Sequence, residues 1–306
     1  MDTIKKSVWN GGPIFIIIAA FLWAFDGIIR RYLYTLPPIT IIFFEHIIGL
    51  CLLLPFVWKS LAKENLSRRE WILIVFISLF SGLLGTLWFT TALLKVHFIS
   101  FSVVFLIQKL QPLFAISSAS IFLKEKFEKK YIMWAVLALV SCYFVTFKNG
   151  VVNLSTGEGT VIAALYAFGA AFAWGSSTTF SKMLLTKVSF KVSTFYRFLF
   201  TTLLASIGLI IFGYTGSLGT PSASQYGLFA LIAVSTGMVA LVLYYKGLAK
   251  TPVHVSTILE LTFPVIAIFI DMTLYHTTLA WSQYLSAIIL SYSMYRIARL
   301  QQNNGI

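Results

Sequence analysis

Seven charged side chains stand inside long apolar stretches of this 306-residue chain, and their types and positions suggest chemistry. They are Asp26, Glu45, Lys109, Arg197, Lys246, Glu260 and Asp271. A charged group near the centre of a bilayer costs at least ~2.5–3.5 kcal/mol, so it generally faces a cavity or a partner of opposite charge. If the apolar stretches cross a membrane, the sequence therefore predicts a polar site inside it.

Lys109 stands in the middle of its apolar stretch, where a lysine stem does not easily reach water. Gln108 and Gln111 flank it, and Pro112 frees a backbone carbonyl one turn earlier. We expect Lys109 to bind a carboxylate or another anionic group of a substrate, with the two glutamines beside it. Pro112 is a candidate hinge.

Glu260 stands four residues before Pro264, on the same face of a helix, and Pro264 is the second candidate hinge. Its carboxylate is a candidate to bind a substrate amine or a proton. The alternative is a fixed ion pair of Lys109 with Glu260 or Glu45. A central acid and base would suit a zwitterion such as an amino acid, and they satisfy each other when the site is empty.

Glu45 and His46 are adjacent and point about 100° apart around a helix, so we expect only one of them to face a cavity. Glu45 is a candidate for binding a substrate amine. Both residues, like Glu260, are candidates for proton coupling, since histidine titrates near neutrality and a buried carboxylate can take up a proton. The alternative for His46 is a hydrogen-bonded packing role.

Asp26 follows Trp23 by three residues and precedes Arg30 by four, which predicts a local Asp26–Arg30 pair on one helical face. Trp23 and Trp174 either stack on a substrate or pack helices together. Arg197 either extends towards water or binds an anion in the cavity. Two further charges are expected near helix ends, outside the site: Lys246 and Asp271.

The composition identifies the class of protein that carries these groups. Apolar residues make up 58% and charged residues 11% of the chain, and the mean hydropathy is +0.88. Soluble domains are about 45–50% apolar and about 25% charged, and disordered chains are poor in aromatic residues. We therefore expect an integral membrane protein. The two cysteines, Cys51 and Cys142, predict neither a disulfide framework nor a metal site, and we expect no cofactor.

A helix that crosses a bilayer core needs about 20 apolar residues. The chain has ten such runs, which predicts an all-α membrane protein: 13–34, 39–58, 71–94, 99–122, 131–147, 159–181, 192–212, 225–248, 255–275 and 279–297. With a cytoplasmic N-terminus, most lysines and arginines lie on the cytoplasmic side, whereas the other side carries Arg30, Arg31, Lys95 and Lys148. Both termini are therefore expected on the cytoplasmic side of the plasma membrane. The net charge of +13 predicts contact with membrane lipids, not nucleic-acid binding.

The two halves of the chain are similar at an offset of about 151–155 residues. The aligned pairs are Trp23 with Trp174, Ser81 with Thr236, Lys95 with Lys250, Gln108 with Glu260, and Pro112 with Pro264. Because five helices is an odd number, the second half must enter the membrane in the opposite direction. Inverted repeats around a midplane site are typical of secondary transporters. The predicted domains are 13–147 and 159–299.

On these motifs the chain resembles the EamA-type drug/metabolite transporters over residues 13–299. The most specific pieces are the segments around Trp23 and Trp174, Leu110-Gln111-Pro112 followed by 122–126, and 256–260 running to Pro264. The resemblance implies a ten-helix carrier of two repeats. Glu125 fits the glutamate patch that follows the first repeat's proline, whereas Leu274-Tyr275-His276-Thr277 lacks that acid. An arginine common in helix 2 is replaced by Glu45-His46, and helix 7 keeps it as Arg197.

We expect a secondary transporter that exports amino acids or similar small metabolites by alternating access through a central cavity. Alternatives are a carrier of drug-like cations, nucleotide-related compounds or sugars, a channel, or a membrane-embedded enzyme. Scattered histidines disfavour the enzyme, and the chain has no G-x-x-x-x-G-K-[ST] motif for ATP. The expected partners are a small-molecule substrate, membrane lipids and, as a candidate, protons; the oligomeric state stays open.

Overall fold

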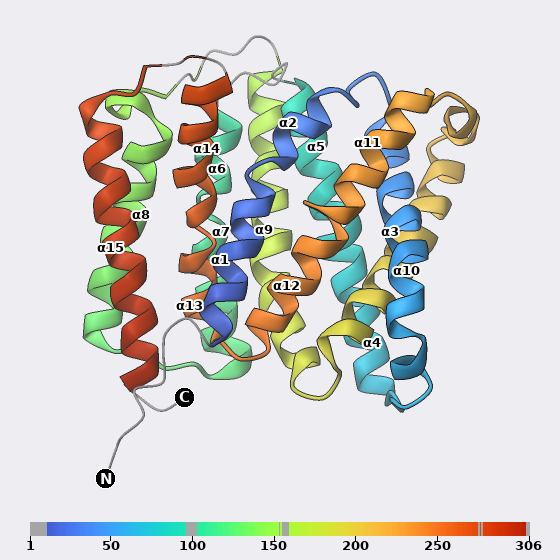
Figure 1. Cartoon of the computed structure of the whole chain (residues 1–306), viewed down its shortest axis with the longest axis horizontal. Helices are drawn as coiled ribbons and strands as arrows, with labels where there is room; N and C mark the ends of the chain where they lie inside the picture. Colours follow the sequence, from blue (N-terminus) through green and yellow to red (C-terminus); the bar gives the residue numbers. More distant parts are fainter. Residues whose placement is uncertain are drawn as a thin grey trace.

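The structure, a computed structural model, describes residues 11–95, 103–152, 154, 159–274, 276 and 278–303. Over these residues the chain forms helices and no strands (Figure 1). The helical elements are α1 Gly12–Trp23, α2 Asp26–Arg31, α3 Pro38–Leu61, α4 Arg68–Ile77, η2 Ser78–Gly85, α5 Thr86–Lys95, α6 Val103–Gln108, α7 Gln111–Ser118, η3 Ala119–Leu123, α8 Lys129–Thr146, η4 Lys148–Gly150, α9 Thr160–Leu185, α10 Phe190–Ile211, η5 Thr215–Gly219, α11 Ala223–Val234, α12 Met238–Leu248, α13 Val253–Leu259, α14 Thr262–Leu274 and α15 Trp281–Asn303.

Nine helices within the described ranges are long and apolar enough to cross a membrane. They are Gly12–Arg31, Pro38–Leu61, Arg68–Lys95, Leu106–Leu123, Lys129–Thr146, Thr160–Leu185, Phe190–Ile211, Ala223–Leu248 and Val253–Leu274. The prediction of an all-α membrane protein is confirmed, and the chain is a multi-pass integral membrane protein. The tenth apolar run becomes α15, a helix of 23 residues that is less apolar than the other nine.

Four of these crossing helices are interrupted part-way. Residues 24–25 separate α1 from α2, 109–110 separate α6 from α7, 235–237 separate α11 from α12, and 260–261 separate α13 from α14. Prolines explain two interruptions, because Pro112 and Pro264 cannot donate the backbone hydrogen bond that would continue the helix. Lys109 and Glu260 therefore stand in the breaks that their prolines create, as discontinuous helices do at transporter sites.

The first and second halves of the chain interleave. The helix α1 packs on α12, and α9 packs on α5 and α7. The helices α3 and α10 lie side by side at one edge of the molecule, and α8 and α15 at the other (Figure 1). One crossing is especially close: a Cβ on Gly175 of α9 would lie 2.6 Å from the backbone oxygen of Gln111 in α7. Each half thus holds the elements that position the other half's polar residues.

The first apolar run, 13–34, corresponds to one candidate span, Gly12–Arg31, which is broken at residues 24–25. Arg30 was counted with the charges of the non-cytoplasmic side, but it lies in α2 and its side chain is only 11% exposed. It is buried because two carboxylates, those of Asp26 and Glu45, face it inside the protein and compensate its charge. The predicted start of the fourth run, 99–102, lies outside the described residues.

Candidate functional site

A polar cluster surrounds Glu260 where α7 packs against α13. The Tyr244 hydroxyl donates a hydrogen bond of 2.6 Å to Oε1 of Glu260, and Nε2 of Gln111 donates one of 3.2 Å to Oε2. Both donors are neutral, and among the described residues no cation forms an ion pair with this carboxylate. Glu260 is therefore a membrane-embedded carboxylate that is hydrogen-bonded but not neutralised by a protein cation.

Lys109 is the complementary group on α6–α7. Its ammonium lies 5.6 Å from the centroid of the Phe263 ring, a cation–π contact, and the described residues place no carboxylate within ion-pair distance of it. The fixed pair with Glu45 or Glu260 is thus absent from the part of the chain described. Beside it, Oε1 of Gln108 is buried and has no hydrogen-bond partner among these residues. The Lys109 ammonium and Oε1 of Gln108 are therefore available to bind a ligand.

Aromatic rings flank this cluster. The Trp23 ring centroid lies 5.1 Å from that of Tyr244, the residue that also binds Glu260. Trp174 makes the corresponding contact in the other half, with its centroid 5.2 Å from that of Phe89, and its indole Nε1 donates to the Ser81 carbonyl. Both tryptophans pack against the opposite half of the chain, and Trp23 adjoins the Glu260 cluster.

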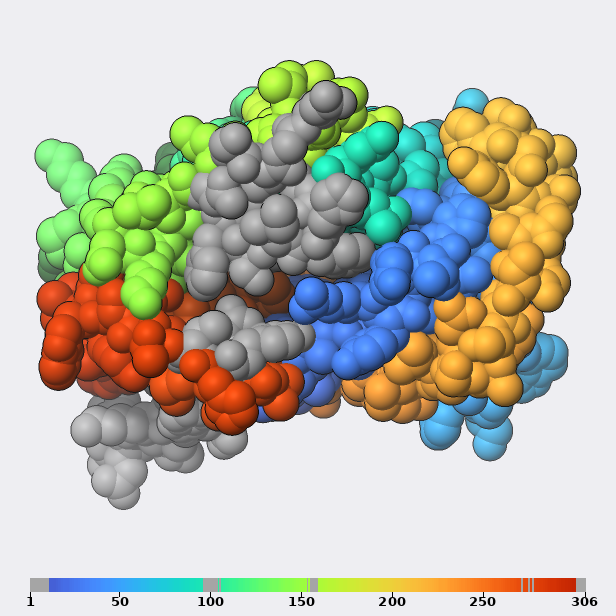
Figure 2. All heavy atoms as spheres, turned by 90° about the horizontal axis from the view of Figure 1, so that it is seen from above, coloured from blue at the N-terminus to red at the C-terminus, as the bar shows by residue number. Residues whose placement is uncertain are grey.

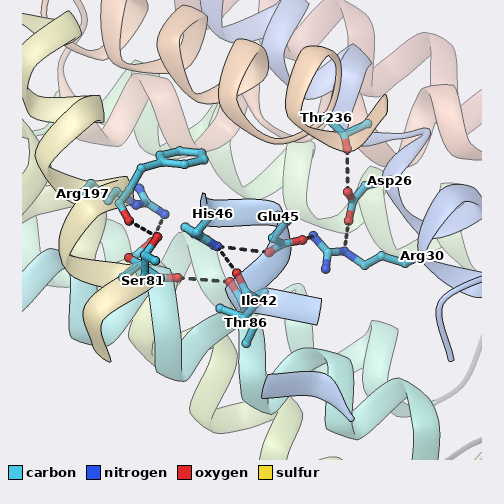
Figure 3. A network of polar contacts seen from close by, with 12 residues as sticks. Asp26, Arg30, Ile42, Glu45, His46, Ser81, Thr86, Arg197 and Thr236 are labelled. Atoms are coloured by element: carbon cyan, nitrogen blue, oxygen red, sulfur yellow. Dashed lines mark hydrogen bonds and ion pairs between the residues drawn. The ribbon is translucent and has the colours of Figure 1, made fainter. Parts of the chain in front are cut away.

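A second network joins α2, α3 and the break between α11 and α12 (Figure 3). The Arg30 guanidinium lies between two acids: Nε donates to Asp26, and Nη2 lies 2.7 Å from Oε2 of Glu45. Asp26 also accepts a hydrogen bond of 2.7 Å from the Thr236 hydroxyl. The predicted Asp26–Arg30 pair is confirmed, and Glu45 joins it from the neighbouring helix.

Glu45 and His46 are both buried, although they point to different neighbours. The reason is that helices pack on both sides of α3: Glu45 meets Arg30, and the His46 ring packs 4.8 Å from the Phe198 ring of α10. Nδ1 of His46 donates to the Ile42 carbonyl at 2.8 Å and lies 3.5 Å from Glu45. This is the hydrogen-bonded packing role that was the alternative for His46.

Arg197 of α10 is held by neutral groups, and His46 and Glu45 lie between it and Arg30 (Figure 3). Nη2 donates to the Ser81 hydroxyl at 2.7 Å, and Nη1 donates to the Tyr245 hydroxyl at 2.9 Å. Ser81 lies in η2, a stretch of π-helix, and such stretches are frequent at functional sites. Of the two charges expected at helix ends, Lys246 sits 4.1 Å over the Phe15 ring, and the Asp271 side chain lies outside the described residues.

At the end of the molecule where α1 begins, Glu125 bridges to the start of α13. Its carboxylate accepts hydrogen bonds from the backbone amides of Val253 and His254 and from the His254 ring. Partial burial raises the pKa of Glu125, but these hydrogen bonds outweigh burial and hold the pKa below its ordinary value. Tyr131 adds a bond from its hydroxyl to the His254 carbonyl. We name this contact the Glu125 clip.

The opposite end holds a cavity of about 780 Å³. It lies between the starts of α3 and α9 and the ends of α5 and α10, and its polar lining residues include Thr91, Lys95 and Tyr214. Figure 2 looks onto this end and shows the teal end of α5 beside the blue α2–α3 segment, with the gold segment after α10 further out. The cavity thus opens at the end from which α3 descends to Glu45.

The sequence analysis missed one residue of the Glu260 cluster, Tyr244. It is one of 14 tyrosines, and only its contacts with Trp23 and Glu260 in the folded chain distinguish it. For Arg30 the four-residue spacing predicted the pair with Asp26 but not the second acid, Glu45. Among the described residues, no group of three or more His, Cys, Asp or Glu side chains is suited to hold a metal ion.

Comparisons with known proteins give a family, a similar transporter and a similar fold. The model of the EamA-like transporter family matches residues 10–147 and again residues 161–298. The riboflavin transporter ImpX of Fusobacterium nucleatum subsp. nucleatum (strain ATCC 23726 / VPI 4351) is 33% identical over 295 residues, covering 94% of this chain and 98% of its own. A crystal structure described only as that of a protein matches with a TM-score of 0.75 at 16% identity, covering 95% of this chain and 96% of that chain, and supports the fold alone.

Proposed function

This chain belongs to the EamA-like transporter family, and on that premise we propose that it carries riboflavin across the membrane. The observation that carries the proposal is the 33% identity to a riboflavin transporter along nearly the whole length of both chains. Family membership makes the protein a membrane transporter of a small molecule. The choice of riboflavin goes further, and the chemistry of the site around Glu260 supports it.

Riboflavin is an uncharged molecule with a planar heteroaromatic ring, ring carbonyls, one ring N–H and a polyhydroxyl chain. The Trp23–Tyr244 pair offers an aromatic surface for such a ring. Lys109 donates hydrogen bonds without an acid to compete for it, and the unpaired Oε1 of Gln108 accepts one. Glu260 and Gln111 provide further polar contacts. We assign substrate binding to Lys109, Glu260, Gln108, Gln111 and Trp23.

Export of an amino acid is the competing proposal, because Lys109 and Glu260 also suit a carboxylate and an ammonium. The two proposals differ in what the aromatic pair contributes: Trp23 and Tyr244 stack on a flavin ring but are dispensable for most amino acids. The direction of net transport is set by the gradients imposed on the carrier and not by these residues.

We further propose that the carrier consists of two inverted five-helix repeats, 13–147 and 159–299, with α15 as the tenth crossing helix. Contacts that repeat between the halves support this arrangement. Trp23 meets Tyr244 in the second half, and Trp174 meets Phe89 in the first, and these residues correspond at the sequence offset noted above. The halves would rock about Pro112 and Pro264, exposing the site to each side in turn.

Both termini are proposed to be cytoplasmic, in the plasma membrane. Single cysteines introduced at 59–70, 123–130, 182–191 and 249–254, in a background without Cys51 and Cys142, should react with an impermeant maleimide only after the cytoplasmic face is opened. Labelling of the 123–130 loop from outside intact cells would overturn both the orientation and the inverted repeat.

Counterflow in proteoliposomes tests the substrate. Vesicles loaded with unlabelled riboflavin should accumulate labelled riboflavin transiently, which a channel does not do. Vesicles loaded with amino acids should show no counterflow of those amino acids. Amino-acid counterflow without flavin counterflow would replace the riboflavin proposal by the amino-acid one. Trp23→Ala should weaken flavin counterflow. Its matched control is Trp281→Ala, which removes a tryptophan that is 88% exposed and should leave flavin counterflow unchanged.

A further inference from the structure

The cluster of Asp26, Arg30 and Glu45 carries two carboxylates and one guanidinium in an enclosed place. The side chains are 24%, 11% and 6% exposed, respectively. Arg30 forms an ion pair with each acid. The other basic group near them among the described residues is the His46 ring, whose Nδ1 lies 3.5 Å from Glu45 and donates to the Ile42 carbonyl. With both acids ionised the cluster therefore has an excess negative charge, and an uncompensated buried charge is costly.

From this arrangement we infer that the cluster binds one proton, on Glu45, and exchanges it during the transport cycle. The inference concerns energy coupling and rests on the proposed transport function. Binding adds a proton to the Glu45 carboxylate and leaves Asp26 and Arg30 as a neutral pair. Release restores the carboxylate, and no other bond forms or breaks.

The hydrogen bonds identify Glu45 as the acceptor of the proton. Asp26 is satisfied at both oxygens, by Arg30 and by the Thr236 hydroxyl. Oε2 of Glu45 lies 2.7 Å from Nη2 of Arg30, and Nη1 of Arg30 is buried without a hydrogen-bond partner. Glu45 is also the more enclosed of the two acids, with a side chain 6% exposed against 24% for Asp26. Burial disfavours the charged form of a carboxyl group, so the proton stabilises Glu45 more than Asp26.

The other titratable groups around α3 do not neutralise Glu45. His46 directs Nδ1 at the Ile42 carbonyl, and its ring packs on Phe198. From α10, Arg197 is engaged by Ser81 and Tyr245. The remaining groups on elements packed against α3 are Arg31 on α2, which is exposed, Tyr226 on α11, which packs on Phe44, Lys95 at the end of α5, Lys191 and Tyr196 on α10, and Tyr244 and Lys246 on α12.

The placement of the cluster links its proton to movement. Asp26 begins α2 directly after one helix break, and Thr236 lies in the break between α11 and α12, whereas Glu45 belongs to the uninterrupted helix α3. A proton on Glu45 cancels its attraction to Arg30 and so weakens the contact between α3 and the broken helices. Glu45 lies six residues, or about 9 Å along the helix, from Ile39 in the lining of the 780 Å³ cavity, through which a proton can approach.

The charge count predicts that two different substitutions have the same effect. Glu45→Gln leaves an Asp26–Arg30 pair, and Asp26→Asn leaves a Glu45–Arg30 pair; each is neutral without a proton. In riboflavin-loaded proteoliposomes, a pH gradient of one unit should support up to a tenfold riboflavin concentration ratio in the wild type if one proton moves per substrate. The ratio should fall to one in either variant, while counterflow at equal pH persists. Glu128→Gln, at an exposed glutamate before α8, should behave as the wild type.

A second readout does not depend on the substrate. Infrared difference spectra recorded across a pH titration should contain a protonated-carboxyl band that Glu45→Gln removes and Glu128→Gln retains. If no riboflavin counterflow is found, the proposed substrate is wrong, and this band still decides the proton site. Loss of the band or of the pH response in Glu260→Gln alone, with both unchanged in Glu45→Gln, would overturn the inference.

Discussion

Replacing Lys109 with methionine tests how the central cation is used. Methionine keeps the length and most of the volume of the side chain but removes its charge and its donors. In the described structure Lys109 contacts the Phe263 ring at 5.6 Å and has no carboxylate partner. Its removal therefore leaves no stranded acid behind.

The magnitude follows from that environment. The cation–π contact contributes about 0.5–2 kcal/mol, and removal of an unpaired cation from the membrane offsets that loss. We expect Lys109→Met to change the free energy of unfolding by no more than about 1 kcal/mol. A lysine engaged in a buried ion pair would behave differently, because breaking such a pair costs about 3–5 kcal/mol.

Binding should respond far more strongly than stability. Loss of a hydrogen bond from a charged donor costs about 1.5–3 kcal/mol, so riboflavin affinity should fall roughly 10- to 150-fold. Unfolding in mild detergent and equilibrium binding, measured on Lys109→Met, Glu260→Gln and the double variant, give both quantities. A stability loss of about 3 kcal/mol or more that Glu260→Gln reverses would refute the reasoning, as would unchanged riboflavin affinity.

Three further outcomes are expected. Gly175→Ala should destabilise the fold by about 1–3 kcal/mol, since its Cβ would lie 2.6 Å from the Gln111 oxygen, whereas Gly227→Ala, which meets nothing within 4 Å, should not; comparative melting decides this. Glu125→Gln should lower the melting temperature at neutral pH, and the melting temperature of the variant should no longer fall in acid through this site. Because the pKa of Glu125 is lowered in the folded chain, the stability that the Glu125 clip adds is complete above the ordinary glutamate pKa of about 4.3. That stability is lost as the pH falls below this value. Equal acid sensitivity of variant and wild type would contradict that assignment. Trp23→Ala should weaken riboflavin binding roughly 5- to 150-fold, from about 1–3 kcal/mol per stacked ring, and an effect as large in Trp281→Ala would count against stacking.

Sequence patterns were sufficient for the membrane class and for the positions of Lys109 and Glu260. Their prolines are visible in the sequence, and a proline breaks a helix wherever it falls in the interior. The contact between Arg30 and Glu45 was not predictable in the same way, because it joins α2 to α3 and depends on how those helices pack. Arginine near a helix end also looks like a loop charge until a buried partner is known.

Helix pairing across the halves was equally hidden. The hydrogen bond from Tyr244 to Glu260 joins residues 16 positions apart, so the chain between them must turn back, and no local spacing encodes that turn. The sequence also did not show that Lys109 would lack a carboxylate partner among the described residues. Acids such as Glu45 and Glu260 occur in other crossing helices, but an ion pair forms only if the fold brings the two side chains together. Both findings depend on where the helix breaks place the side chains.

The low apolarity of α15 has a consequence for biogenesis. Gln283 is 1% exposed and donates to the Val145 carbonyl at the end of α8, and Tyr292 packs on Trp134 of the same helix. These partners are synthesised long before α15 leaves the ribosome, and they belong to the other half of the chain. We therefore expect α8, which is already in the bilayer, to stabilise α15 as it inserts. If the second half were expressed alone, α15 would leave the translocon without this packing partner.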